Sequence, residues 1–373
     1  MSARLSLRQL AILQSVATVP TTLVFLPGLT LQKVGHDAVW TVFGASLLGL
    51  AWTALIAWAG RGKSPQVVLA DITPRCLGRG LLLLYGITLA SVIIAQWDEL
   101  SAFVQAELLP ATPSWAVLAL ALCAVMVCTR KGWLGLSRTV DIIAPLAAVA
   151  FVMMAAWTAS LVQGWNLLPW LLLHPVHDRK AVWLPATFIG EGFVGMAYAD
   201  FTKGTPRQIT TAVVAGQVVS SGVLVVVVLL ALGGLGPVYG GMVTYPWYAL
   251  IKELRLDGFL THLEFLFGPM WIMLLYLKSA IWLIAVADVG RKIWHKSPYW
   301  GWILATGLVT MAFSVSHSTD TSRLVYLRVW WGNREFPLLW ILAVGGGISA
   351  RWRHQKDSQH GPVPVESSSS GPA

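Results

Sequence analysis

The feature that most constrains this chain is a series of long apolar runs that carry almost no charge. A helix that crosses a bilayer needs about 20 mostly apolar residues. Ten such runs follow one another, and only the sixth and eighth contain a charged side chain, at residues 9–32, 38–60, 80–97, 108–129, 142–174, 181–199, 208–251, 265–287, 298–317 and 336–350. The sequence therefore predicts an all-α integral membrane protein with ten transmembrane helices.

Composition excludes most water-soluble folds. Charged residues make up 12% of the 373 residues and the mean hydropathy is +0.67, whereas a soluble domain carries about 25% charged residues. The net charge of +9 does not imply a nucleic-acid partner, because membrane proteins gather Lys and Arg in cytoplasmic loops. The expected macromolecular environment is the lipid bilayer.

The distribution of basic residues predicts the orientation. When loops are assigned alternately to the two sides, 17 of the 26 Lys and Arg residues fall on the side of the N-terminus and 8 on the other. This bias is typical of a cytoplasmic side. It supports a multi-pass protein with an even number of spans and both termini in the cytoplasm.

Helix breakers lie at matching positions in two spans. The first span contains Pro20 and Pro27, and the sixth contains Pro185 and a Gly190-Glu191-Gly192 stretch. Interrupted helices at corresponding positions indicate an inverted repeat with a site near the bilayer midplane, although Pro and Gly are also simply more frequent in membrane helices. We expect broken helices one and six in a five-plus-five, LeuT-like bundle.

The domain organisation follows from this repeat. We expect one permease-like bundle over residues 1–352, with a first half at 5–162 and a second half at 181–350. Residues 353–373 are rich in Ser, Pro and Gln, which predicts a disordered cytoplasmic tail.

Two charged residues lie inside spans, where an ionisable group is costly and functional by default. Glu191 could hold a ligand ammonium, carry a proton, or make a structural hydrogen bond to the first helix. Lys278 lies near the middle of the eighth span, where it could replace or mimic a coupling cation, pair with Glu191, or extend its ammonium to the interface.

Catalytic and cofactor motifs are absent from the sequence. The chain has no phosphate-binding loop, zinc-protease motif, nucleophile elbow or dinucleotide fingerprint, and its three cysteines lack metal-ligand spacing. We therefore expect no enzyme activity, no cofactor and no metal site.

Short motifs along the chain resemble one family. They are Phe25-Leu26-Pro27, Leu108-Leu109-Pro110-Ala111-Thr112-Pro113, Arg130-Lys131-Gly132, Phe188-Ile189-Gly190-Glu191, Leu235-Gly236-Pro237, Thr244-Tyr245-Pro246 and Lys278-Ser279. Their order and spacing, over roughly residues 5–347, resemble the B-subunit (GerAB-type) family of spore germination proteins. These are permease-like members of the amino acid-polyamine-organocation transporter superfamily.

The resemblance implies a permease-like subunit of a germinant receptor in the spore inner membrane, with A-type and lipoprotein C-type partner subunits. It implies that a small nutrient, an amino acid or similar, binds between helices one and six. The candidate ligand-binding residues are Thr18, Thr21, Thr22, Gly190, Glu191 and Gly192. One departure is that Pro20-Thr21-Thr22 stands where the family tends to have a glycine-rich stretch, which removes backbone room for docking a ligand carboxylate.

Three functions remain open at this point. The first is a receptor subunit that senses a nutrient without net transport. The second is a proton- or ion-coupled secondary transporter for amino acids or amines. The third is a channel-like or scaffolding subunit in which Glu191 and Lys278 form only a structural pair.

Overall fold

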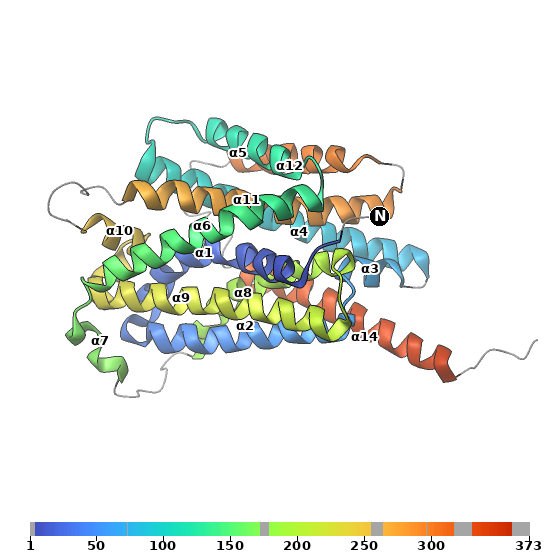
Figure 1. Ribbon diagram of the computed structural model, residues 1–373, viewed down its shortest axis with the longest axis horizontal. Coiled ribbons are helices and arrows are strands. Elements are labelled where there is room, and N and C mark those ends of the chain that lie inside the picture. The colour runs from blue at the N-terminus through green and yellow to red at the C-terminus, as the bar shows by residue number, and fades with distance from the viewer. Residues whose placement is uncertain are drawn as a thin grey trace, which may run out of the picture.

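The computed structural model describes residues 4–72, 74–171, 179–254, 264–295, 297–316 and 330–359, and most of this part of the chain is helical (Figure 1). The helices are α1 (Leu7–Val34), α2 (Ala38–Gly60), α3 (Pro65–Ala70), α4 (Arg75–Phe103), α5 (Ser114–Thr129), α6 (Trp133–Ala159), α7 (Gly164–Leu171), α8 (Trp183–Gly190), α9 (Pro206–Met242), α10 (Pro246–Lys252), α11 (Glu264–Ile293), α12 (Tyr299–Val315) and α14 (Phe336–Gln359). Short 3₁₀ and π segments join them, namely η1 (Gly35–Asp37), η2 (Val104–Leu108), η3 (Arg179–Val182), η4 (Glu191–Phe201) and η5 (Trp331–Glu335).

Each predicted span coincides with a helical segment. Five stretches are long and apolar enough to cross a membrane, at Leu7–Gly60, Arg75–Leu108, Trp133–Ala159, Pro206–Met242 and Glu264–Ile293, and α5 and α12 are shorter apolar helices. Side chains such as Val127, Ile142 and Val309 are 76%, 73% and 68% exposed, as expected where acyl chains replace water as the solvent. The all-α membrane fold is confirmed, whereas the count of ten crossings stays a prediction.

The sixth span is interrupted as expected. The α-helix α8 ends at Gly190 and the 3₁₀ segment η4 begins at Glu191. A change of helix type within a span alters which backbone groups are paired, and such non-α backbone is tolerated only inside protein or beside a cavity. The acid of the sixth span therefore stands at the break itself.

The first span differs from the prediction, because α1 is helical from Leu7 to Val34, through Pro20 and Pro27. A proline inside a helix removes one backbone hydrogen bond, but its fixed φ is compatible with an α-helix, so the helix can continue. Two side chains also donate to carbonyls of this segment. The Trp271 indole donates to the Pro20 carbonyl at 2.7 Å, and the Thr22 hydroxyl donates to the Val19 carbonyl at 2.8 Å. The expected break in helix one is therefore not observed.

The last helix also differs from the prediction. It continues to Gln359, so residues 353–359 are helical rather than part of a disordered tail. Arg351 anchors this end, because its guanidinium donates to the Trp58 carbonyl at 2.6 Å and lies 3.6 Å from the Trp58 ring centroid. Residues 360–373 lie outside the described residues.

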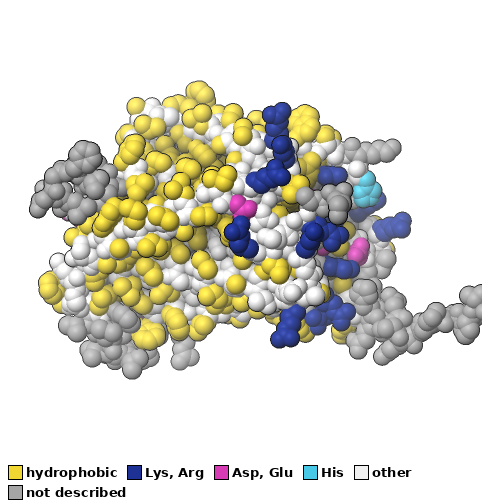
Figure 2. Space-filling view, in the orientation of Figure 1, with side chains coloured by type: hydrophobic (Ala, Val, Ile, Leu, Met, Phe, Trp, Pro, Cys, Tyr) yellow, Lys and Arg dark blue, Asp and Glu magenta, His cyan; other side chains and the backbone are white. Residues whose placement is uncertain are grey.

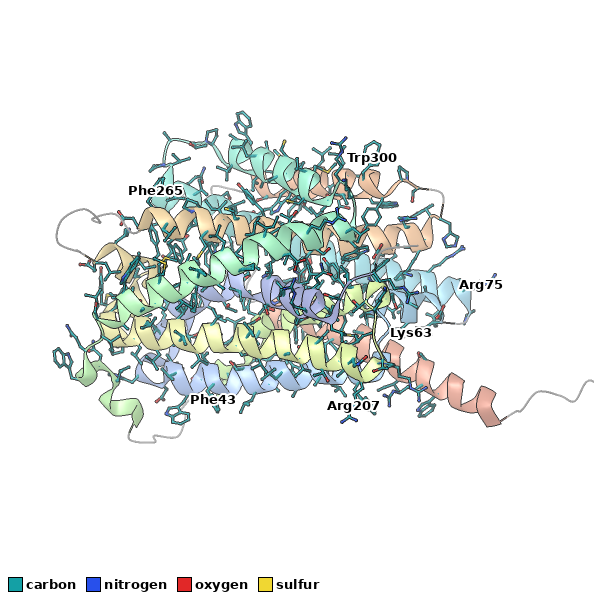
Figure 3. All side chains as sticks on the ribbon, in the orientation of Figure 1. Phe43, Lys63, Arg75, Arg207, Phe265 and Trp300 are labelled. Atoms are coloured by element: carbon teal, nitrogen blue, oxygen red, sulfur yellow. The ribbon has the colours of Figure 1, made fainter. Side chains whose placement is uncertain are left out.

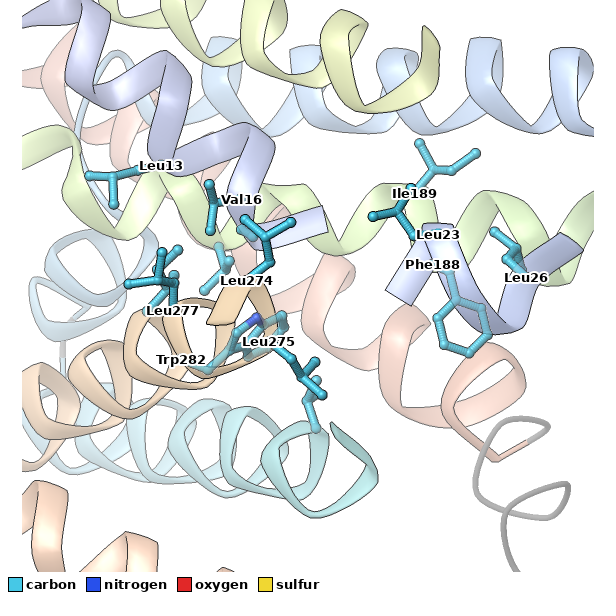
Figure 4. Packing of buried hydrophobic residues seen from close by; sticks show 14 of the residues in the cluster. Leu13, Val16, Leu23, Leu26, Phe188, Ile189, Leu274, Leu275, Leu277 and Trp282 are labelled. Carbon is cyan, nitrogen blue, oxygen red and sulfur yellow. The ribbon is translucent and has the colours of Figure 1, made fainter. Parts of the chain in front are cut away.

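The helix α11 runs through the centre of the bundle and packs against α1 and α4. Figure 4 shows this core from close by: Leu274, Leu275, Leu277 and Trp282 of α11 lie near Leu13 and Val16 of α1, and further along α1 Leu23 and Leu26 lie with Phe188 and Ile189 of α8. These side chains are almost fully buried. A polar residue on the inner faces of α1, α8 or α11 is therefore shielded from lipid.

The N-terminal segment is pinned to the end of η4. Leu5 forms a parallel bridge with Thr202, in which its amide donates to the Phe201 carbonyl at 2.8 Å and its carbonyl accepts from the Lys203 amide at 3.0 Å. The cytoplasm-facing ends predicted for spans one and six are thus tied together by backbone.

Basic side chains gather at one end of the molecule, where the N-terminus and the end of α14 also lie (Figures 1 and 2). Lys63, Arg75 and Arg207 share this end, opposite Phe265 (Figure 3). This asymmetry agrees with the distribution of Lys and Arg expected from the alternating loops.

Candidate functional site

The two charged residues found inside spans form a buried ion pair. The ammonium Nζ of Lys278 lies 2.6 Å from Oε2 of Glu191, and the two side chains are 0% and 3% exposed. The same ammonium donates to the Thr21 hydroxyl. One cation therefore links α11, α1 and the first residue of η4.

The close contact of the two buried charges offsets part of the cost of removing them from water. Taking two charges out of water carries a desolvation cost that is offset only when the pair is close and its remaining polar groups are satisfied. The short contact and the additional Thr21 acceptor offset part of that cost. Removal of either partner would leave an uncompensated buried charge.

The glycines at the break allow close packing between protein elements. A Cβ on Gly190 would come within 2.6 Å of the Phe336 ring, and a Cβ on Gly192 would come within 2.0 Å of Gln217 Oε1 and 2.2 Å of Gln14 Nε2. The space beside both glycines is thus filled by side chains of α14, α9 and α1.

A chain of side-chain amides connects α1, α9 and the end of α8. Gln14 Nε2 donates to Gln217 Oε1 at 2.8 Å, and Gln217 Nε2 donates to the Ile189 carbonyl at 2.8 Å. Ile189 lies two residues before Glu191, so its carbonyl is near the change from α to 3₁₀ helix. The amide chain supplies a donor to a backbone carbonyl beside the break and links α1, α9 and α8 to one another.

A cavity of about 250 Å³ lies beside Glu191. Its walls come from α1, α4, the α8–η4 break, α12 and the segment that leads into α14. The lining residues are Thr21, Ser91, Val92, Ile94, Ala95, Gln96, Glu99, Phe188, Glu191, Phe313, Trp330, Trp331 and Glu335. The site thus combines aromatic walls with acidic and amide groups, which is typical of a pocket for a small polar ligand.

A second polar chain positions one wall of the cavity. The Trp97 indole donates to the Ser279 hydroxyl at 3.2 Å, and this hydroxyl donates to Gln96 Oε1 at 3.3 Å. Because Ser279 follows Lys278 in α11, the ion pair and the Gln96 side chain are held by adjacent residues.

The cavity contains some but not all of the predicted site residues. Thr21 and Glu191 line it, and Lys278 contacts both. The remaining candidates are buried in helix packing and do not line it, namely Thr18, Thr22, Gly190 and Gly192. Within the described residues, no group of three or more His, Cys, Asp or Glu side chains could hold a metal ion.

Sequence reasoning did not find the polar residues of α4 and of η5. Ser91, Gln96 and Glu99 lie in the second half of α4, and Glu335 stands directly before the last predicted span. The available signal was a polar residue at or near the end of an apolar run, which is also the ordinary pattern at a membrane interface.

Comparisons with known proteins agree with this architecture. MhsT in complex with L-phenylalanine superposes with a TM-score of 0.65 at 13% identity, covering 90% of this chain and 88% of that chain. Mhp1, a nucleobase-cation-symport-1 family transporter in a closed conformation with bromovinylhydantoin bound, gives a TM-score of 0.61 at 11% identity, covering 95% of this chain and 94% of that chain. These likenesses establish the LeuT fold.

No curated relative matches the sequence. The family of spore germination proteins, the spore permeases, matches residues 4–322. Since this match covers most of the chain, the chain belongs to the spore germination protein family.

Proposed function

We propose that this chain is the permease-like subunit of a spore germinant receptor. In this proposal it senses a small nutrient, an amino acid or similar, in the cavity beside Glu191 and passes the signal to A-type and lipoprotein C-type subunits. It lies in the spore inner membrane with both termini in the cytoplasm. Membership of the family and the L-phenylalanine bound to MhsT support this function.

The buried Lys278–Glu191 pair carries the argument for sensing rather than ion-coupled transport. Lys278 is covalently part of α11 and is bonded to both Thr21 and Glu191, so its ammonium cannot leave the site as a free metal cation would. A ligand then acts by its different affinity for two arrangements of the bundle. The transporter alternative requires an exchangeable cation or a proton at this position.

The test is the dose response of germination to nutrient in spores that carry Glu191→Gln. We expect the response, measured per amount of protein in the membrane, to shift to higher nutrient concentration, because the neutral amide no longer holds Lys278 across the break and leaves its ammonium unpaired. Glu107→Gln is the matched control, since Glu107 forms a similar 2.7 Å pair with Lys252 in a half-exposed position. An unchanged response in Glu191→Gln would remove this residue from the sensing site.

Transport is tested separately with the purified protein in liposomes. We expect no accumulation of a labelled amino acid under a sodium or proton gradient. Accumulation that depends on the gradient would favour the secondary transporter instead.

A further inference from the structure

A second hollow lies outside the central cavity, where several apolar helices end. The helix α5 ends at Thr129, α6 begins at Trp133 and α12 begins at Tyr299, and these three residues line a hollow of about 370 Å³. It belongs to the end of the molecule where basic side chains gather (Figure 2). Trp300 (Figure 3) also lines this hollow and is 60% exposed. An exposed tryptophan at the end of an apolar helix is typical of the level of the lipid headgroups.

Three cations line this hollow without a carboxylate partner. Arg130 and Lys131 form the exposed turn between α5 and α6, and Arg291 comes from the last turn of α11. None of them takes part in an ion pair within the described residues. The Arg291 guanidinium instead lies over the Tyr299 ring, 5.5 Å from its centroid. The N–H donors of these cations are therefore available to an anion.

A carboxylate in the wall does not cancel this charge. Asp288 is 8% exposed, lies three and four residues before Arg291 and Lys292 in α11, and interacts electrostatically with both. Its charge is therefore balanced within α11, and the two cations of the α5–α6 turn remain. The start of α6 adds to them, because its N-cap Gly132 supplies no side-chain acceptor for the first N–H groups and a helix N-terminus carries partial positive charge.

The inner wall of the hollow is the segment that ties α1 to η4. Leu5 and Phe201 line the hollow, and the Leu5 amide donates to the Phe201 carbonyl in the backbone bridge described above. The Trp133 ring packs on the same segment, with its centroid 5.1 Å from that of Phe201. An anion in the hollow would therefore lie against the contact that links helices one and six.

We propose that this hollow binds the phosphate of an anionic membrane lipid. Arg130, Lys131 and Arg291 bind the phosphate oxygens, while the acyl chains stay in the bilayer beside Trp300. Basic pockets between transmembrane helices bind headgroups of this kind. A lipid is favoured over a soluble phosphate compound because the hollow lies where apolar helices end, which is the depth of the lipid phosphates. This inference goes beyond the proposed function and requires no nutrient in the central cavity.

The experiment measures the unfolding temperature of the purified full-length protein in a neutral detergent as each probe is added. Phosphatidylglycerol and cardiolipin are the anionic lipids, and phosphatidylcholine is the zwitterionic control. Glycerol 3-phosphate supplies a phosphate without acyl chains, and a hexaglutamate peptide represents an acidic protein segment. We expect both anionic lipids to raise the unfolding temperature, because a ligand that binds only the folded state stabilises it. The other probes should bind about tenfold more weakly.

The test variant is Arg130→Gln, Lys131→Gln. Both side chains are exposed, so the variant should fold, and it should bind the anionic lipids about tenfold more weakly. The matched control is Arg75→Gln, Arg207→Gln, which removes the same charge from the same end (Figure 3) at positions that do not line the hollow. It should keep the original affinity. If the test variant does not fold, Lys131→Gln alone should still weaken binding.

Several results would overturn this inference. Equal stabilisation by phosphatidylcholine, or an equal loss of affinity in the control variant, would show a general effect of lipid or of surface charge. Binding of glycerol 3-phosphate or hexaglutamate as tightly as the anionic lipids would assign the hollow to a soluble phosphate compound or to an acidic protein segment. A response to none of the probes would also contradict it. None of these results changes the germination response of Glu191→Gln, so this inference and the proposed function fail separately.

Discussion

We expect the buried pair of Lys278 and Glu191 to contribute strongly to the free energy of unfolding. We expect Lys278→Met to destabilise the protein by about 3–5 kcal/mol, because it leaves a buried carboxylate without its partner. The double variant Glu191→Gln, Lys278→Met should recover most of this loss. Unfolding temperature and membrane yield measure both effects.

Lys252→Met provides the comparison, since the side chains of Lys252 and Glu107 are 44% and 21% exposed and solvent-exposed pairs contribute about 0–1 kcal/mol. If Lys278→Met unfolds at the same temperature as Lys252→Met, the buried pair has no structural role. If the double variant is no more stable than Lys278→Met alone, the loss does not come from an unpaired charge.

Only some residues of the site could be predicted from the sequence. Glu191 and Lys278 could be predicted because a charge within an apolar run is rare and costly. Glu335 and Gln96 could not, because each lies near the end of a run, where polar residues are ordinary. Their convergence depends on how η5 packs against α4, and no local pattern encodes that contact.

The break between α8 and η4 depends on the absence of a side chain at Gly192. We expect Gly192→Ala to lower the unfolding temperature and to disrupt the Gln14–Gln217 amide chain, since the added Cβ would lie 2.0 Å from Gln217 Oε1. Gly222→Ala in α9 is the matched control. Its Cβ meets nothing within 4 Å, so removing a flexible glycine should be neutral or stabilise the helix by about 0.5–1 kcal/mol.

A Gly192→Ala protein as stable as Gly222→Ala would show that the packing at the break is loose. Measured unfolding temperatures of the two variants in the same detergent decide between these results.

The helices themselves show where helix-breaker patterns succeed and fail. The glycines and proline of the sixth span predicted its interruption correctly. The prolines of the first span predicted a break that is not present, because the fixed φ of proline is compatible with an α-helix. The Trp271 indole and the Thr22 hydroxyl also donate to the Pro20 and Val19 carbonyls of α1. One of these two donors lies about 250 residues away in sequence, so only the folded bundle reveals it.

The orientation of the whole bundle can be tested through its basic end. In a background without Cys76, Cys123 and Cys128, we expect Arg207→Cys to react with a membrane-impermeant maleimide only in inside-out vesicles. Glu264→Cys, next to Phe265 at the opposite end (Figure 3), should react only in intact cells. The reverse pattern would place the N-terminus outside the cytoplasm.

The length and order of the helices were the most predictable property of the molecule. Apolar run length follows directly from bilayer thickness, so each expected span coincides with a helical segment. The end of the last helix was less predictable, because Arg351 reaches back to Trp58 and the helix continues beyond the apolar run.

The bridge between Leu5 and Thr202 limits how this bundle can open. Helices one and six cannot separate at that end unless the hydrogen bonds from Leu5 to Phe201 and from Lys203 to Leu5 are broken. With these bonds intact, the two helices move together, because they are linked at one end by the backbone bridge and further along by the contacts of Lys278 with Thr21 and Glu191. In the proposed function, a bound nutrient would then move these two segments together, and a neighbouring subunit would detect that displacement without any solute crossing the membrane.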